Sequence, residues 1–215
     1  MEIDNKNGDK IDMFHSKKGL VSIIIPVFNG ESRIEELIDS LINQTYKNIE
    51  IITVDNNSTD NSIKILEKLN DEKISLKIFS NIKNEGYCGG CNKGIEKANG
   101  EFLLFLSQDR IMNFDWIEKT VKEINIDEKT CCVIGKVVRD GASSAEFGHS
   151  YDVYGAVLIN ALPKESNLFF GGGTVLVRKT ILDEIGIFDP EFFIYQEDVD
   201  ICWRIRLSGK KIKIV

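Results

Sequence analysis

The sequence predicts an α/β protein with a mostly parallel central sheet that is flanked by helices. Three observations lead to this expectation: apolar runs alternate with helical patterns, the runs are rich in β-branched residues, and polar turn residues follow each run. A continuous apolar run is typical of a strand that is buried on both faces, as in parallel sheets. The repeated order of strand and helix predicts helices on both faces of one sheet.

The first half of the chain carries four strand patterns and three helical patterns. The strands are expected at residues 21–25, 49–54, 74–79 and 101–106. A first helix is expected to begin at Glu31 or Ser32, because apolar residues then recur at helical spacing at positions 34, 37, 38, 41 and 42. Two further helices are expected at 61–69, after a polar loop with capping residues at 55–60, and at 91–98, after a glycine-rich loop at 84–90.

After Asp109 the regular alternation ends. Helices are expected at 115–124 and 179–185, strands at 131–138 and 210–215, and a glycine hinge that runs into a strand at 171–177. A last helix begins at the acidic block near Glu197 and ends with Gly209 at its C′ position. Residues 139–167 give no pattern that predicts an element.

We expect residues 1–19 to form a flexible polar tail and residues 20–215 to form a single domain. Within that domain, residues 20–110 form one half and residues 111–215 the other. The sequence stops inside an apolar strand pattern, from which we expect further elements beyond residue 215.

The composition limits the function classes. The chain has 215 residues, 42% of them hydrophobic and 28% charged, which is ordinary for a globular protein. Its net charge of −7 argues against nucleic-acid binding and leaves at most a peripheral association with membranes. There is no apolar run of membrane-spanning length and no signal-peptide pattern, and the odd number of 5 cysteines favours reduced thiols in a cytoplasmic protein.

The sequence Cys88-Gly-Gly-Cys91 admits three interpretations. A structural zinc site would need a second, well-spaced ligand pair, and Cys131-Cys132 is poorly spaced for that role. A redox pair would stand at the start of a helix that follows a strand, and the pattern allows this. We favour the third interpretation, in which small residues line a tight loop.

The acidic block is the strongest candidate for chemistry. Glu197, Asp198 and Asp200 lie within four positions, just after the aromatic run 192–195. Burial and like charges raise the pKa of a carboxyl group, and a carboxylate held in this way can act as a general base. The alternative is an acidic first turn of a helix, which the helix dipole favours.

Other candidates follow the predicted parallel strands, where open α/β sheets bind their ligands. Asp55 could accept a hydrogen bond from a base or a ribose, or it could cap the next helix. Asp109 could hold a hard divalent cation that keeps water and substrate phosphates as its other ligands, or it could be a turn residue. Neither a dinucleotide-binding GxGxxG nor a P-loop is present, and no nucleophile motif surrounds His149.

In this order the landmarks resemble family 2 glycosyltransferases of the GT-A fold, whose central sheet is Rossmann-like. The resemblance is closest to the rhamnosyltransferase-like branch and covers residues 20–215. It rests on five segments: VSIIIPVFN at 21–29, SLINQTY at 40–46, IITVDNNSTD at 51–60, NEGYCGGCN at 84–92 and GIFDPEFFIYQEDVD at 186–200.

The resemblance implies inverting transfer of a sugar from a nucleotide-diphosphate sugar to a hydroxyl of a glycan or lipid-linked acceptor, in polysaccharide or glycolipid synthesis. It implies that Asp198 is the general base and that Asp109 contacts Mg²⁺ or Mn²⁺ and the diphosphate. It assigns the two halves to donor binding (20–110) and to acceptor binding and catalysis (111–215). The implied donor-binding residues are Pro26, Phe28, Glu31, Asp55, Asn57, Asn84, Gly86, Gln108 and Asp109. The implied acceptor-side residues are Gly172, Gly173, Glu197 and Trp203.

The sequence departs from the family at Ser107-Gln108-Asp109, where Asn-Pro-Asp or Asp-x-Asp is usual, and Arg110 follows in place of a small residue. One carboxylate therefore stands where two are frequent, which opens the question of metal dependence. Two other functions remain as alternatives to the transferase. One is a non-catalytic module that binds nucleotide sugars or glycans, and the other is a redox protein that uses Cys88 and Cys91.

Overall fold

The computed structural model describes residues 16–72, 76–135, 150–151, 157–158 and 173–215. The strands are β1 Lys17–Val27, β2 Ile49–Asp55, β3 Leu76–Ser80, β4 Gly100–Leu106, β5 Thr130–Ile134, β6 Ser150–Tyr151, β7 Val157–Leu158, β8 Thr174–Arg178 and β9 Lys211–Ile214. The helices are α1 Ile34–Ile42, α2 Ser62–Glu72, α3 Gly86–Lys97, α4 Trp116–Ile124, α5 Lys179–Ile185 and α6 Glu197–Leu207.

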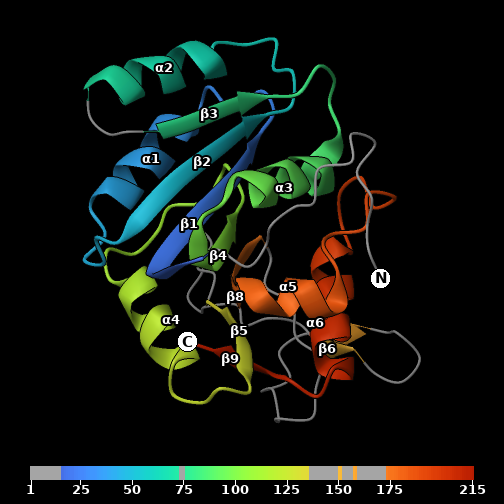
Figure 1. The fold of residues 1–215 in the computed structure, drawn as a ribbon. Coiled ribbons are helices and arrows are strands. Elements are labelled where there is room, and N and C mark those ends of the chain that lie inside the picture. The colour runs from blue at the N-terminus through green and yellow to red at the C-terminus, as the bar shows by residue number, and fades with distance from the viewer. Residues whose placement is uncertain (1–15, 73–75, 136–149, 152–156, 159–172) are drawn as a thin grey trace.

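Seven of the described strands form one twisted sheet in the order β3-β2-β1-β4-β8-β5-β9 (Figure 1). Strands β1 to β4 are parallel, and β5 pairs in parallel with β9. Strand β8 is antiparallel to both of its neighbours, β4 and β5. The expected mostly parallel sheet is confirmed. The reversal of β8 was not part of the expectation.

Helices cover both faces of the sheet, and each face has its own core. On one face α3, α5 and α6 pack on residues such as Ile24, Phe105 and Val177. On the other face α1, α2 and α4 pack on residues such as Ile23, Leu104 and Leu176. Neighbouring residues of one strand thus enter opposite cores, which explains why the strand sequences are apolar at every position.

Strand β1 begins at Lys17, so residues 17–19 belong to the sheet and not to the predicted tail. The extension crosses an irregularity between Lys17 and Val21, where Gly19 has a φ of 70°. The Lys17 amide donates to the Asn99 carbonyl at 2.7 Å. This pairing with a distant strand gives the polar segment its structure, and nothing in its local sequence predicts it. Residues 1–15 of the predicted tail lie outside the described residues.

Helix α3 begins at Gly86, and the prediction of a glycine-rich loop up to residue 90 was wrong. Glycine disfavours helices by about 1 kcal/mol relative to alanine, which is why a loop was expected. The glycines serve packing instead. A Cβ at Gly90 would lie 2.7 Å from Pro26 Cβ, and one at Gly94 would collide with Ile24 Cγ2. They let α3 lie close to β1, and this contact outweighs the local preference.

Other expectations for the second half are confirmed where the structure describes it. Helix α6 starts at Glu197 and stops before Gly209, which has a φ of 78°. Strand β5 ends at Ile134, so Gly135 is not part of the strand that was predicted to run to residue 138, and residues 136–138 lie outside the described ones. Of the segment 139–167, the structure describes the short pair β6 and β7.

The close approach of α3 to β1 leads to a stability prediction. Gly94→Ala should destabilise the protein by about 1–3 kcal/mol, because overpacking against Ile24 exceeds the ~1 kcal/mol gain in helix propensity. Glu96→Ala, at an exposed position of the same helix, is the matched control and should change stability by less than about 0.5 kcal/mol. Denaturant unfolding of both variants measures the difference. Equal stabilities would show that α3 does not need glycine for packing.

Candidate active site

The site lies at the edge of the sheet where the parallel strands β1, β2 and β4 end. Val27 stands opposite Asp55 in the β1–β2 register, and the Asn56 amide donates to the Val27 carbonyl at 2.7 Å. Because the carboxyl ends of parallel strands meet at one edge, the loops that follow them lie together. These loops carry most of the residues that the sequence singled out for donor binding.

Gln108 joins the loop after β4 to the loop after β1. Its Oε1 accepts from the Phe28 amide at 2.9 Å, and its Nε2 donates to the Phe28 carbonyl at 3.0 Å. Both ends of the Gln108 amide are therefore engaged by backbone, which makes Gln108 a support for Phe28. The Phe28 side chain is 42% exposed beside these loops.

Glu31 and Asp60 hold the start of α2 to the β1 loop. Glu31 Oε2 accepts from the backbone and side-chain nitrogens of Asn61, both at 2.9 Å. The Glu31 amide donates to Asp60 Oδ2 at 3.0 Å, and Asp60 Oδ1 accepts from the Ser62 amide at 2.9 Å. Asp60 thus accepts from the first amide of α2, while the carboxylate of Glu31, an expected donor-binding residue, is engaged by Asn61.

Asp55 is 4% exposed at the end of β2. Its two carboxylate oxygens lie 3.3 and 3.1 Å from the Ser58 amide that donates to them. The residue therefore closes the turn that precedes α2, which partly supports the alternative of a local cap. Asn57, within this turn, is exposed and has a φ of 62°, a left-handed conformation that asparagine tolerates.

Asn56 links β2 to α3, although it was not among the expected site residues. Its Nδ2 donates to the Gly86 carbonyl at 2.9 Å, and its Oδ1 accepts from Asn81 Nδ2 at 2.9 Å. Asn84 closes the same corner, since its Oδ1 accepts from the Gly86 amide at 2.9 Å. The only signal for Asn56 was its place between Asp55 and Asn57. The sequence could not tell which asparagine pointed inward.

The segment before the acidic helix lies on the start of α3. The Tyr87 amide donates to the Phe193 carbonyl at 2.8 Å. Gly86 has a φ of 71°, and a Cβ there would collide with that same carbonyl. Glycine is thus required twice at position 86, by conformation and by contact. Through Asn56, Gly86 and Phe193, the structure brings the acidic block to the edge where β2 ends.

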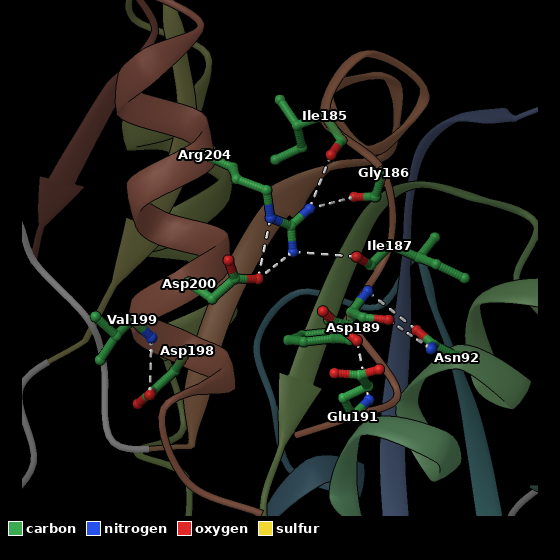
Figure 2. Close-up of polar contacts among 11 residues, drawn as sticks. Asn92, Ile185, Gly186, Ile187, Asp189, Glu191, Asp198, Val199, Asp200 and Arg204 are labelled. Atoms are coloured by element: carbon green, nitrogen blue, oxygen red, sulfur yellow. Dashed lines mark hydrogen bonds and ion pairs between the residues drawn. The ribbon is translucent and has the colours of Figure 1, made fainter. Parts of the chain in front are cut away.

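The three carboxylates of the block have different surroundings. Glu197 is 8% exposed, and among the described residues its Oε2 has no hydrogen-bond partner. Burial is the main cause that raises the pKa of Glu197. Asp198 is half-buried, and its Oδ1 accepts from the Val199 amide at 2.9 Å. Asp200 forms an ion pair with Arg204 at 2.6 Å, and Figure 2 shows its carboxylate turned toward Arg204 and that of Asp198 turned away.

The remaining predicted residues are placed as follows. The Ser107 amide donates to the Gly173 carbonyl at 2.9 Å, so Gly173 lies beside the end of β4. Gly172 lies outside the described residues. Trp203 is 46% exposed on α6, but five helical positions separate it from Asp198 by about 140° around the axis. The helix does not bring Trp203 to the face that carries Asp198.

Asp109 is the candidate ligand for a metal. Its side chain is 62% exposed, and its Oδ1 lies 3.7 Å from Arg110 Nε. The described residues contain no group of three His, Cys, Asp or Glu side chains that could hold a cation. A single carboxylate fits Mg²⁺ or Mn²⁺ only if substrate phosphates and water supply the other ligands, as is usual for Mg²⁺.

The cysteine geometry argues against redox chemistry. All five thiols are buried and free, and Cys88 and Cys91 lie inside α3. Burial and nearby carboxylates raise the pKa of Cys88 to about 12, and burial raises that of Cys91 as well. A reactive cysteine needs a lowered pKa and access to solvent. The interpretation of these cysteines as small packing residues fits the structure better than a redox pair.

The comparisons with known proteins identify the family. The model of "Glycosyl transferase family 2" matches residues 22–186. The chain belongs to this family. The match ends before α6, so the acidic block lies beyond the matched residues.

Two curated relatives support this assignment. An uncharacterised glycosyltransferase of Haemophilus influenzae is 30% identical over 83% of this chain, and one of Rickettsia typhi is 34% identical over 88%. The matched regions make up 58% and 60% of these two relatives. The chain thus spans somewhat more than half of the length of each.

Solved structures confirm the GT-A fold. TarS of S. aureus in complex with UDP has a TM-score of 0.70 at 23% identity, covering 91% of this chain and 57% of that one. The mannosyltransferase PcManGT of Pyrobaculum calidifontis, in complex with GDP-Man and Mn²⁺, has a TM-score of 0.75 at 21% identity, covering 95% of this chain and 56% of that one. Among the described helices of this glycosyltransferase-family chain, none has the length and apolarity needed to cross a membrane.

Burial of Glu197 makes stability depend on pH. The pKa of Glu197 is higher in the folded state than in the unfolded state. The stability that this group contributes is therefore fully present below the unfolded pKa and is lost as the pH rises through the folded pKa. Glu197→Gln, which is neutral and similar in shape, should therefore raise Tm over wild type more at neutral pH than near pH ~4. Calorimetry at both pH values, with exposed Glu191→Gln as the control, measures this. A gain for Glu197→Gln that is the same at both pH values would contradict it.

Proposed function

We propose that this chain transfers a sugar from a nucleotide-diphosphate sugar to a hydroxyl of a glycan or lipid-linked acceptor, with inversion at the anomeric carbon. The observation that carries the proposal is the position of the acidic block. Phe193 is bonded to the start of α3, and α3 is bonded through Asn56 to the end of β2. The block therefore stands at the edge of the sheet where an α/β protein binds its ligand.

The donor would bind over the loops after β1, β2 and β4. In this proposal the exposed Phe28 ring lies against the nucleotide base, and Asp55, at the end of β2, accepts a hydrogen bond from the base or ribose. Asn84 and Gly86, which are hydrogen-bonded to each other at the start of α3, would line the donor cleft. Support comes from two structures with the same fold, which are complexes of TarS with UDP-GlcNAc and of the mannosyltransferase with GDP-Man.

Asp198 would act as the general base. Its carboxylate would take the proton of the acceptor hydroxyl while that oxygen attacks the anomeric carbon, on the face opposite the bond to the leaving diphosphate. The bond from the anomeric carbon to the diphosphate oxygen breaks, and the electron pair leaves with the diphosphate. Binding both partners in this alignment would supply much of the rate.

Asp109 would hold a divalent cation together with the donor diphosphate, and this cation would supply positive charge at the leaving group. Arg110, whose Nε lies 3.7 Å from Asp109 Oδ1, adds a positive charge at the same place. The chain would act in polysaccharide or glycolipid synthesis. Its five free thiols fit a reducing compartment such as the cytoplasm, where it would work at the inner face of the membrane.

The base assignment predicts a selective loss of turnover. Asp198→Asn keeps the size of the side chain but cannot accept the proton, so kcat should fall by about 10²–10⁴-fold. Nucleotide binding should persist, measured as the thermal shift with UDP, GDP, CDP and dTDP. Turnover is measured with UDP-GlcNAc, GDP-mannose and dTDP-rhamnose as donors in the presence of Mn²⁺. Asp189→Asn, in the loop before α6, is the matched control and should keep its turnover.

Two outcomes would contradict the proposal in different ways. Full turnover by Asp198→Asn would show that another group is the base. Saturable binding of a nucleotide sugar by the wild type, without turnover of any donor, would replace the enzyme with the non-catalytic binding module.

Asp109 predicts how activity depends on metal. Asp109→Asn should raise the Mn²⁺ concentration for half-maximal turnover by at least roughly tenfold. Removing a group that only supports a metal ligand already weakens metal binding by about that factor, and Asp109 would be a direct ligand. A Mn²⁺ titration of turnover, compared with Asp115→Asn at the start of α4, measures the effect. If wild-type turnover proceeds fully in the presence of a chelator, Asp109 does not hold a metal in the reaction.

A further inference from the structure

We propose that Arg204, together with its ion-pair partner Asp200, is a positioning residue for Asp198. In this role Arg204 fixes the first turn of α6 against the end of α5, and so determines where the Asp198 carboxylate stands. The inference rests on the proposed function, because it explains how this chain would hold its general base. Nothing in the family's motifs assigned a role to Arg204.

Every N–H donor of Arg204 has an acceptor (Figure 2). Nε donates to Asp200 Oδ2 at 3.0 Å, and Nη2 donates to the same oxygen at 2.6 Å. Nη1 donates to the carbonyls of Ile185 and Gly186 at 2.8 and 3.1 Å, and Nη2 donates to that of Ile187 at 3.1 Å. A guanidinium has five N–H donors in a rigid plane, and all five are used here.

The acceptors are three consecutive carbonyls at the end of α5. The last carbonyls of a helix have no partner within the helix, and their partial negative charge favours a cation. Gly186, with a φ of 86°, turns the chain out of α5 at this point. Arg204 therefore supplies, from α6, the N–H donors for these three carbonyl oxygens.

Asp200 balances the charge of Arg204 from one turn earlier on α6. The two side chains are 29% and 25% exposed, so their ion pair is partly shielded from water. The Asp200 amide also donates to the Gln196 carbonyl at 2.9 Å, at the start of the helix. The pair thus lies directly beside the turn that carries Asp198.

The loop between α5 and α6 is held from the opposite side by α3. Asn92 Nδ2 donates to the Phe188 carbonyl at 2.8 Å, and its Oδ1 accepts from the Phe188 amide at 3.1 Å. Further along, the Phe193 carbonyl accepts from the Tyr87 amide at 2.8 Å. Figure 2 shows Asn92 and Arg204 reaching this loop from α3 and α6. Helix α3 thus holds the loop at Phe188 and at Phe193, and Arg204 of α6 holds it at residues 185–187.

Lysine cannot replace arginine in this arrangement. It keeps the positive charge but offers three donors from one atom, so it cannot bind three carbonyls and a carboxylate in one plane. Arg204→Lys should therefore let the first turn of α6 shift. A shift of about 1 Å in a reacting group lowers a rate by roughly 10²-fold, whereas donor binding on the sheet loops needs no contact with α6.

The test compares Arg204→Lys with Arg178→Lys. Arg178, the last residue of β8, is a matched control because its guanidinium also has several acceptors. It donates to the carbonyls of Thr130 and Ile124, to Glu101 and to Asn125. Both variants should lose stability. Only Arg204→Lys should lower kcat, by about 10- to 100-fold, while the Kd for the nucleotide that shifts Tm most stays unchanged. Hydrogen exchange should accelerate at residues 187–200 in Arg204→Lys and near residues 124–130 in Arg178→Lys.

Several outcomes decide the matter. Equal kcat values for the two variants, or unchanged exchange at residues 187–200 in Arg204→Lys, would overturn the positioning role. If Arg204→Lys does not fold, Asp200→Asn replaces it. This variant keeps an oxygen for Arg204 but removes the charge, and it should show the same changes to a smaller extent. If the wild type shows no turnover, the proposed function fails, and the exchange data alone decide whether Arg204 fixes the first turn of α6.

Discussion

The contact between the start of α3 and the Phe193 carbonyl is the constraint on which the site depends. It joins two segments that are more than a hundred residues apart, and it exists because Gly86 has no side chain. The same corner of α3 is bonded to Asn56 at the end of β2. The link from α3 to Phe193 is made by backbone groups, and the link from α3 to β2 by one buried side chain, that of Asn56.

Much of the fold could be predicted from local pattern, because both faces of the sheet are buried. Ile23 and Ile24 belong to opposite cores, so the strand is apolar throughout and stands out from the helices around it. The errors arose where distant contacts decide the structure. Lys17 joins the sheet by pairing beside Gly100, and α3 forms despite its glycines because they fit against β1. A local reading of the sequence contains neither contact.

The sequence indicated which loops would lie together better than it indicated what each side chain in those loops binds. The loops after β1, β2 and β4 do lie together, as the ends of parallel strands must. The roles within them depend on which side-chain atoms already have partners. Gln108 binds the Phe28 backbone and Glu31 binds the start of α2. Asn56 and Arg204, which were not expected to have a role, each join two separate elements by hydrogen bonds. A polar residue in a loop looks the same in sequence whether it faces ligand or backbone.

The acidic turn of α6 shows why three carboxylates can stand within four positions. Three ionised groups so close together would repel one another, and the structure reduces that repulsion in two ways. Arg204 balances the charge of Asp200, and burial raises the pKa of Glu197 and so opposes its ionisation. Both devices act on the neighbours of Asp198. Both therefore reduce the repulsion around Asp198 at the start of the helix, where the helix dipole favours negative charge.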